Sequence, residues 1–171
     1  IECSAMAQKY LGDYFDIHCG GEDHIPVHHT NEIAQTEARV GTRLANFWMH
    51  GYFLLSNDAK MAKSAGEFLR VDSLIDRGYD PLAFRYLCLT SHYRTQLNFT
   101  WEALDAAVTG LARLRSGFHA LPQDAAAAAD PVLIERFTAC INDDLNLPRA
   151  LAVAWETLRG DAQAPAVTRA T

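Results

Sequence analysis

The sequence has little positive charge, no closely spaced pair of cysteines and no long apolar run. Its 15 Lys and Arg residues are outnumbered by 21 Asp and Glu residues, and the formal net charge is -6. This balance excludes a general basic surface for nucleic acid, although a local positive strip remains compatible with it. No stretch has the length and composition of a transmembrane helix, and no signal peptide is recognisable. We therefore expect no membrane partner.

The cysteines are few and far apart. Cys3, Cys19, Cys88 and Cys140 include no CxxC pair. Together with the lack of a signal peptide, this favours a reduced, cytoplasmic setting. At 171 residues and 49% hydrophobic composition, the chain is long enough to bury one sizeable core or two small ones.

Histidines are concentrated in one segment, since four of the seven lie between residues 15 and 37. Within it, a buried strand is predicted around Ile17, then a glycine turn at residues 20 and 21, then a helix from about Val27 to Gly41. The segment therefore carries polar side chains at the carboxyl end of a predicted strand.

His28 and Glu32 are four residues apart on this predicted helix. That spacing places an imidazole and a carboxylate on one face, one turn apart, where both can reach a single ion. Zinc accepts nitrogen, oxygen and thiolate ligands, and Cys3, just before a short predicted helix at 4–11, is a plausible third ligand. The sequence thus indicates a candidate zinc site.

Each of these residues also has an ordinary structural interpretation. A His and a Glu at this spacing are most often a solvated surface pair, and a free cysteine such as Cys3 is most often a small buried hydrophobe. The context favours a site, because His18, His24, His29 and Asp23 crowd the end of the strand, where ligands bind in open α/β sheets.

Residues 56–68 combine two lysines with several small residues. Lys60 and Lys63 are three apart, and Gly66 follows among alanine and serine. Small residues let the backbone approach a phosphate while two ammonium groups neutralise it. A KxxKS segment alone is most often a solvated loop, but its position directly after a predicted strand favours phosphate binding.

The order of predicted elements indicates an α/β fold followed by helices. Residues 47–55 are aromatic and apolar enough for a second buried strand, which completes a parallel strand, helix, strand unit of the Rossmann kind. Further helices are predicted at 71–77, 98–117, 131–141 and 147–159. Another is predicted to begin at Asp80-Pro81, with Asp80 as the capping residue and proline at the first helical position. The three helices from residue 98 onward predict a small bundle.

Seven segments, in order, resemble the later part of cysteinyl-tRNA synthetase, a class I aminoacyl-tRNA synthetase. They are IECSAM at 1–6, FDIHCGGEDHI at 15–25, HHTNEIAQTEA at 28–38, FWMHGYF at 47–53, KMAKSAGEF at 60–68, YDPLAFRYLCLTSHYRTQLNFTWEAL at 79–104 and INDDLNLPRALAVAWE at 141–156. KMAKS is similar to the KMSKS signature of the class. The chain opens inside a motif, without Met, after the place where the family carries a first Rossmann half with a HIGH motif. We therefore expect a fragment that is inactive by itself.

The resemblance implies an α/β fold, the C-terminal half of a class I Rossmann-like catalytic domain followed by an α-helical bundle. Residues 1–97 would hold the second half of the catalytic domain with the KMSKS-like loop, and 98–171 a truncated helical bundle that approaches tRNA. The implied activity is that of a cysteine-tRNA ligase, which activates cysteine with ATP and transfers it to tRNA(Cys). The implied partners are cysteine, ATP with Mg2+, and tRNA(Cys), and the implied state is a cytoplasmic monomer.

The resemblance also implies roles for the residues of the histidine segment. Cys3, His28 and Glu32 would bind Zn2+, with a further cysteine ligand outside this chain. His18 would line the cysteine pocket, with Asp23 as a weaker neighbour. Zinc holds a thiolate far better than a hydroxyl or a methyl group, which gives the metal a physical reason to select cysteine.

In the lysine segment the resemblance implies that Lys60 and Lys63 are catalytic and that both, with Gly66, bind ATP. The lysines would stabilise the triphosphate as charge moves during adenylate formation. This chain has Ala62 where the family has Ser. The change puts one hydrogen bond in doubt but not the lysines.

Two alternatives remain open at this point. One is the related ligase that joins cysteine to an amino sugar in mycothiol synthesis, which shares the zinc site and a KMSKS loop. NEIAQ at 31–35 and INDDLNLPRAL at 141–151 favour the synthetase. The other is a noncatalytic module that binds only tRNA or metal.

Overall fold

The computed structural model describes residues 1–56, 59–60, 70–121 and 130–159. By its internal contacts the chain divides into two compact units. The first is Ile1–Phe53 with Tyr93–Gln96, and the second is Leu54–His92 with Leu97–Thr171. The functional boundary expected between residues 97 and 98 stays a prediction.

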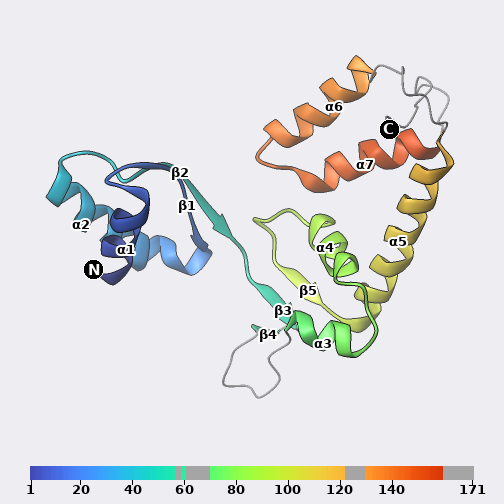
Figure 1. Cartoon of the computed structure of the whole chain (residues 1–171), viewed down its shortest axis with the longest axis horizontal. Helices are drawn as coiled ribbons and strands as arrows, with labels where there is room; N and C mark the ends of the chain where they lie inside the picture. Colours follow the sequence, from blue (N-terminus) through green and yellow to red (C-terminus); the bar gives the residue numbers. More distant parts are fainter. Residues whose placement is uncertain (57–58, 61–69, 122–129, 160–171) are drawn as a thin grey trace. The chain divides into compact units, whose positions relative to one another are not determined.

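The first unit contains the predicted parallel strand, helix, strand arrangement (Figure 1). Its elements are α1 (Glu2–Leu11), β1 (Phe15–Gly21), the 3-10 turn η1 (Glu22–His24), the π-helical turn η2 (Ile25–His29), α2 (Thr30–Val40) and β2 (Ala45–Gly51). Strands β1 and β2 pair in parallel. Helix α2 ends at Gly41, whose φ of 72° lies in the left-handed region that glycine adopts without strain. The α/β class and the predicted helix stop are both confirmed.

Three local details differ from the predictions. Gly20 is inside β1 and not in a turn. A turn of π-helix precedes α2, so the helical path starts at Ile25 rather than Val27. Cys3 lies in the first turn of α1 and not before the helix. The next residue, Ser4, joins α1 to α2, because its hydroxyl donates to Gln35 Oε1 at 2.8 Å.

One face of the β1–β2 pair is exposed, which contradicts the prediction that both strands are buried. Ile17 and Phe47 are register partners, and they are 54% and 66% exposed. In the described part of the chain this sheet has two strands. The apolar residues therefore predict correctly that the strands pair, but they do not predict that one face of the pair is left uncovered. The predicted strand at 47–55 also divides into β2 and a separate β3, because the chain leaves the sheet at Tyr52.

The second unit begins with a small sheet and continues as helices. Strand β3 (Leu54–Ser56) pairs in parallel with β5 (Leu97–Phe99) and antiparallel with β4 (Ala59–Lys60). The helices are α3 (Val71–Asp76), α4 (Pro81–Leu89), α5 (Trp101–Ala120), α6 (Pro131–Asn142) and α7 (Leu147–Arg159). The Asp80 carboxylate accepts from the backbone N–H of Leu82 at 2.9 Å, so the predicted cap of α4 is confirmed.

Helix α5 starts three residues later than predicted. Asn98 belongs to β5, and the Thr100 hydroxyl caps the helix by accepting from the Ala103 N–H at 3.1 Å. Apolar residues of α3, α4, β5 and α5 form the core, with Leu104 completely buried. The Trp155 indole N–H donates to the Tyr86 hydroxyl at 3.0 Å and so joins α7 to α4.

The bundle predicted from the last three helices is confirmed, since α7 packs against both α5 and α6. A second cluster of buried residues, Cys140, Ala150 and Val153, lies between α6 and α7. Among the described residues, no helix combines the length and the apolar composition needed to cross a bilayer.

Candidate metal centre

The register of β1 and β2 sets the positions of the site residues. His18 pairs with Trp48, and Gly20 pairs with His50. Because side chains alternate along a strand, residues 18 and 20 share one face of β1, and residues 48 and 50 share one face of β2. Ring contacts from His18 and Trp48 to His29 show that this face is turned toward the helical segment η2–α2.

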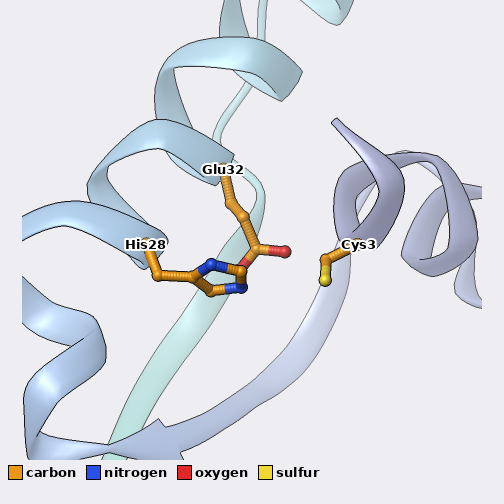
Figure 2. Close-up of side chains that lie close together, drawn as sticks. All are labelled: Cys3, His28 and Glu32. Atoms are coloured by element: carbon orange, nitrogen blue, oxygen red, sulfur yellow. The ribbon is translucent and has the colours of Figure 1, made fainter.

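The three ligands predicted from the sequence come together in the structure. Suitable donor atoms of Cys3, His28 and Glu32 all lie within 4.8 Å of one another. Figure 2 shows the Cys3 thiol and the His28 imidazole both directed toward the Glu32 carboxylate, one from α1 and the other from the turn before α2. His28 Nε2 lies 3.8 Å from Glu32 Oε2, as expected for an i, i+4 pair.

Burial distinguishes this group from a solvated surface pair. The Glu32 side chain is only 4% exposed, whereas the His28 side chain is 45% exposed and Cys3 is exposed. A buried carboxylate needs a charged or hydrogen-bonding partner to offset its desolvation. The group therefore has an inner anionic donor and two donors accessible to an ion from solvent.

His18 is one of the partners of that carboxylate. Its Nε2 lies 2.8 Å from Glu32 Oε2, a hydrogen bond in which the ring N–H donates. The ring also packs against Trp48, with centroids 4.7 Å apart. The role expected for His18 in a cysteine pocket stays a prediction, but the structure places it directly beside the candidate metal ligands.

His29 and His50 also belong to the site, although the sequence gave His29 only as one of several polar neighbours and did not indicate His50. His29 Nδ1 and His50 Nε2 lie 2.8 Å apart, so one ring donates a hydrogen bond to the other. His29 is only 3% exposed. Burial, followed by the nearby His18, lowers the pKa of His29 to about 4, and burial, followed by Arg94, also lowers the pKa of His50. Both rings are therefore neutral near pH 7.

For His50, the sequence does contain a signal that points to the site. Trp48 and His50 are two apart in a predicted strand, as are His18 and Gly20, so period-two alternation places each pair on one face. The sequence does not show the register in which the two strands pair, and that register is what places His18 beside Trp48 and Gly20 beside His50.

His24 and Gly20 complete the inner part of the cluster. His24 Nδ1 is buried without a hydrogen-bond partner among the residues that the structure describes. A Cβ atom on Gly20 would lie 2.7 Å from this nitrogen, 2.5 Å from His29 Cε1 and 2.7 Å from His29 Nε2. Glycine is therefore required here for space, because two imidazoles approach its α-carbon.

We expect Gly20→Ala to disturb the histidine cluster while leaving the fold intact. The new methyl group would displace His29, which is buried and held by His50. Loss of such an outer-shell arrangement typically costs 10- to 100-fold in metal affinity, and we expect about tenfold by zinc competition with a chelating dye. Gly51→Ala in the neighbouring strand is the matched control, because a Cβ there meets nothing within 4 Å. Equal affinities for the two variants would contradict the expectation.

The structure gives fewer details for the other residues that the sequence predicted to act in a site. Asp23 lies in η1, after the end of β1, and a Cβ on Gly21 would meet its Oδ1 at 2.5 Å, so the carboxylate lies over the strand end. Lys60 is the last residue of β4. Lys63 and Gly66 are outside the described residues. Their predicted roles stay predictions.

The chain is similar to cysteine-tRNA ligases over almost its whole length. It is 60% identical to cysteine-tRNA ligase 1 of Burkholderia lata, covering all of this chain and 36% of the relative. It is 46% identical to the cysteine-tRNA ligase of Novosphingobium aromaticivorans, covering 92% of this chain and 35% of the relative. The chain thus spans about a third of the length of these curated relatives.

Solved structures show the same fold at low sequence identity. Methionyl-tRNA synthetase of Mycobacterium tuberculosis bound by methionyl-adenylate superposes with a TM-score of 0.62 at 20% identity, over 84% of this chain and 32% of that one. A LeuRS from Agrobacterium radiobacter, in a ternary complex with tRNA and LeuAMS, superposes with a TM-score of 0.60 at 16% identity. The match covers 87% of this chain and 23% of that one. Both likenesses support the α/β class I architecture.

The family model described as tRNA synthetases class I (C) catalytic domain matches residues 1–109, which include both strands of the first unit and every member of the candidate metal centre. The resemblance inferred from the motifs is confirmed, and the chain belongs to the class I (C) tRNA synthetase catalytic-domain family, with cysteine-tRNA ligases among its relatives.

Proposed function

We propose that the protein of which this chain is a part is a cysteine-tRNA ligase. It would activate cysteine with ATP to cysteinyl-adenylate and transfer the cysteinyl group to tRNA(Cys). The observation that carries this proposal is the convergence of Cys3, His28 and Glu32 in a class I fold. A sulfur, a nitrogen and an oxygen donor at one point are suited to zinc, and few other common ions accept all three.

Zinc at this position would supply a Lewis acid that prefers a thiolate to the hydroxyl of serine or the methyl group of alanine. Residues of this chain would bind the ion and hold its ligands in place. The Cys3 thiol sits in the first turn of α1, and its sulfur lies within 4.8 Å of donor atoms of His28 and Glu32. Glu32 is oriented by the His18 N–H, and such outer-shell hydrogen bonds hold a carboxylate ligand in place. His18 and Asp23 would line the cysteine pocket beside it.

ATP with Mg2+ would bind at the KMAKS segment. Lys60 and Lys63 would meet the triphosphate, with Gly66 allowing close approach of the backbone. The helices α5, α6 and α7 would approach tRNA. Because the net charge of the chain is -6, that contact would be confined to local positive groups. A cytoplasmic monomer fits these roles.

The full-length protein tests this proposal. We expect it to catalyse cysteine-dependent ATP-pyrophosphate exchange and to attach cysteine to tRNA(Cys), with serine at least about a hundredfold less effective, as for a site built around one polar group of its substrate. A mycothiol-type ligase would share the exchange but would transfer cysteine to an amino sugar and not to tRNA. A protein that binds tRNA or zinc without exchange activity would contradict the proposal.

A further inference from the structure

The histidine cluster contains a second set of donors behind the one already described. Suitable donor atoms of His18, His29 and Glu32 also lie within 4.8 Å of one another. His18 Nε2 is 2.8 Å and His29 Nε2 is 3.9 Å from the same Glu32 oxygen, Oε2. Donors of one zinc ion lie about 2.0–2.3 Å from it, so these three need only small side-chain movements to share an ion.

The surroundings of His29 are those of a metal ligand. A ligating histidine almost always gives its other ring N–H to an acceptor, which fixes the tautomer and the ring plane. The His29 Nδ1 atom lies 2.8 Å from His50 Nε2, so a proton on Nδ1 leaves the Nε2 lone pair facing Glu32. His29 therefore already has the outer-shell partner that an inner-sphere ligand needs.

An unsatisfied atom lies near His29. The buried His24 Nδ1 has no partner among the described residues. A single point, the position of a Cβ on Gly20, is 2.7 Å from this nitrogen and 2.7 Å from His29 Nε2. Two imidazole nitrogens thus approach one small volume from different elements, and a buried polar atom without a partner is unusual enough to require an explanation.

We propose that His18, His29 and Glu32 form a second metal position, deeper than the one at Cys3, His28 and Glu32 and sharing Glu32 with it. Its two imidazoles and one carboxylate suit Zn2+, Co2+ or Ni2+, without the thiolate that makes the outer position selective for soft ions. In the ion-free state the His18 Nε2–H donates to Glu32, so binding an ion through Nε2 requires the ring proton to be on Nδ1. We expect one ion at one position or the other, because His18, His28 and His29 all face the same Glu32 oxygen, Oε2.

This inference goes beyond the proposed function, although it shares Glu32 with the zinc site proposed there. Cobalt absorption separates the two positions. Cobalt bound at Cys3 gives a thiolate-to-metal charge-transfer band in the near ultraviolet, and cobalt held by imidazole and carboxylate alone does not. The experiment titrates the 171-residue chain with Co2+, with folding followed by circular dichroism.

The Cys3→Ala/His28→Ala variant should still bind one cobalt ion, without the charge-transfer band. Adding His18→Gln and His29→Gln should reduce binding to the level of Glu32→Ala. His92→Ala/His119→Ala is the matched control, because both histidines belong to the other unit, and it should bind as the unmodified chain does. The proposal is overturned if Cys3→Ala/His28→Ala binds no more cobalt than Glu32→Ala.

A second variant separates a metal role from a structural one. His50→Leu removes the partner of His29 without touching a proposed ligand. In the Cys3→Ala/His28→Ala background it should weaken cobalt binding by about 10- to 100-fold, the usual effect of losing an outer-shell partner. In the unmodified chain it should leave the charge-transfer band in place. If His50→Leu left the cobalt affinity of the Cys3→Ala/His28→Ala variant unchanged, the second metal position would be contradicted. If the unmodified chain showed no thiolate charge-transfer band with cobalt, only the zinc site at Cys3, His28 and Glu32 would be contradicted.

Discussion

Lys63→Ala in the full-length protein is expected to slow cysteine-dependent ATP-pyrophosphate exchange by at least about a hundredfold, the lower end for loss of a group that stabilises transition-state charge. A lysine is a compact point charge, and negative charge on the phosphates shifts mainly as the adenylate forms. Its loss should therefore lower kcat and kcat/KM together, with a smaller change in the KM for ATP.

Two neighbours in the same segment provide the comparison. Ala62→Ser, which introduces the family residue, should change the exchange rate little. Lys60→Ala should have the smaller effect of the two lysine variants. If Lys60→Ala abolished exchange while Lys63→Ala stayed within a few-fold of the parent, the roles would be reversed. If neither lysine variant changed the exchange rate, the segment would be only a connection between elements. The proposed function would then lose the support that comes from the KMAKS segment.

Cys3→Ala/His28→Ala in the full-length protein should remove tightly bound zinc. Two of the three donors that this chain supplies to the outer position are lost, so the fall in affinity should exceed the 10- to 100-fold cost of losing one outer-shell partner. Metal analysis after dialysis against a chelator measures this directly. Residual weak binding at His18, His29 and Glu32 would be removed by the chelator.

The matched control is Cys19→Ala/His119→Ala, which also removes one cysteine and one histidine. Cys19 is exposed on β1, close in sequence to the site but not one of its donors, and His119 lies on α5. Zinc should be retained in this variant. Undiminished zinc in Cys3→Ala/His28→Ala would contradict the assignment of the outer ligands.

The parts of this protein that depend on local spacing were predictable from the sequence. His28 and Glu32 meet because a helix repeats every 3.6 residues, which holds whatever surrounds the helix. The cap at Asp80 and the stop at Gly41 have the same origin, since each satisfies backbone groups within a few residues of itself. The α/β class followed from the order of such segments.

Burial was harder to predict, because it depends on what covers a segment and not on the segment itself. The apolar alternation around Ile17 and Phe47 indicated strands, and strands formed, but one face of the pair remains exposed in the described part of the chain. Conversely, the polar residues His29 and Glu32 are among the most buried in the first unit. Their desolvation is offset by hydrogen bonds and neighbours that the sequence does not place side by side.

The sequence alone determined the candidate ligands Cys3, His28 and Glu32, and the motifs determined the family. Only the tertiary structure decided which other histidines join them. The bond from His18 to Glu32 spans 14 residues and that from His29 to His50 spans 21. The first bond requires α2 to pack against β1, and the second requires the parallel register that brings His50 on β2 level with Gly20 on β1. A shift of one residue in that register would turn His50 to the opposite face of the sheet. Register is set by the packing of the whole unit, and for that reason the sequence did not show that His29 and His50 contact each other.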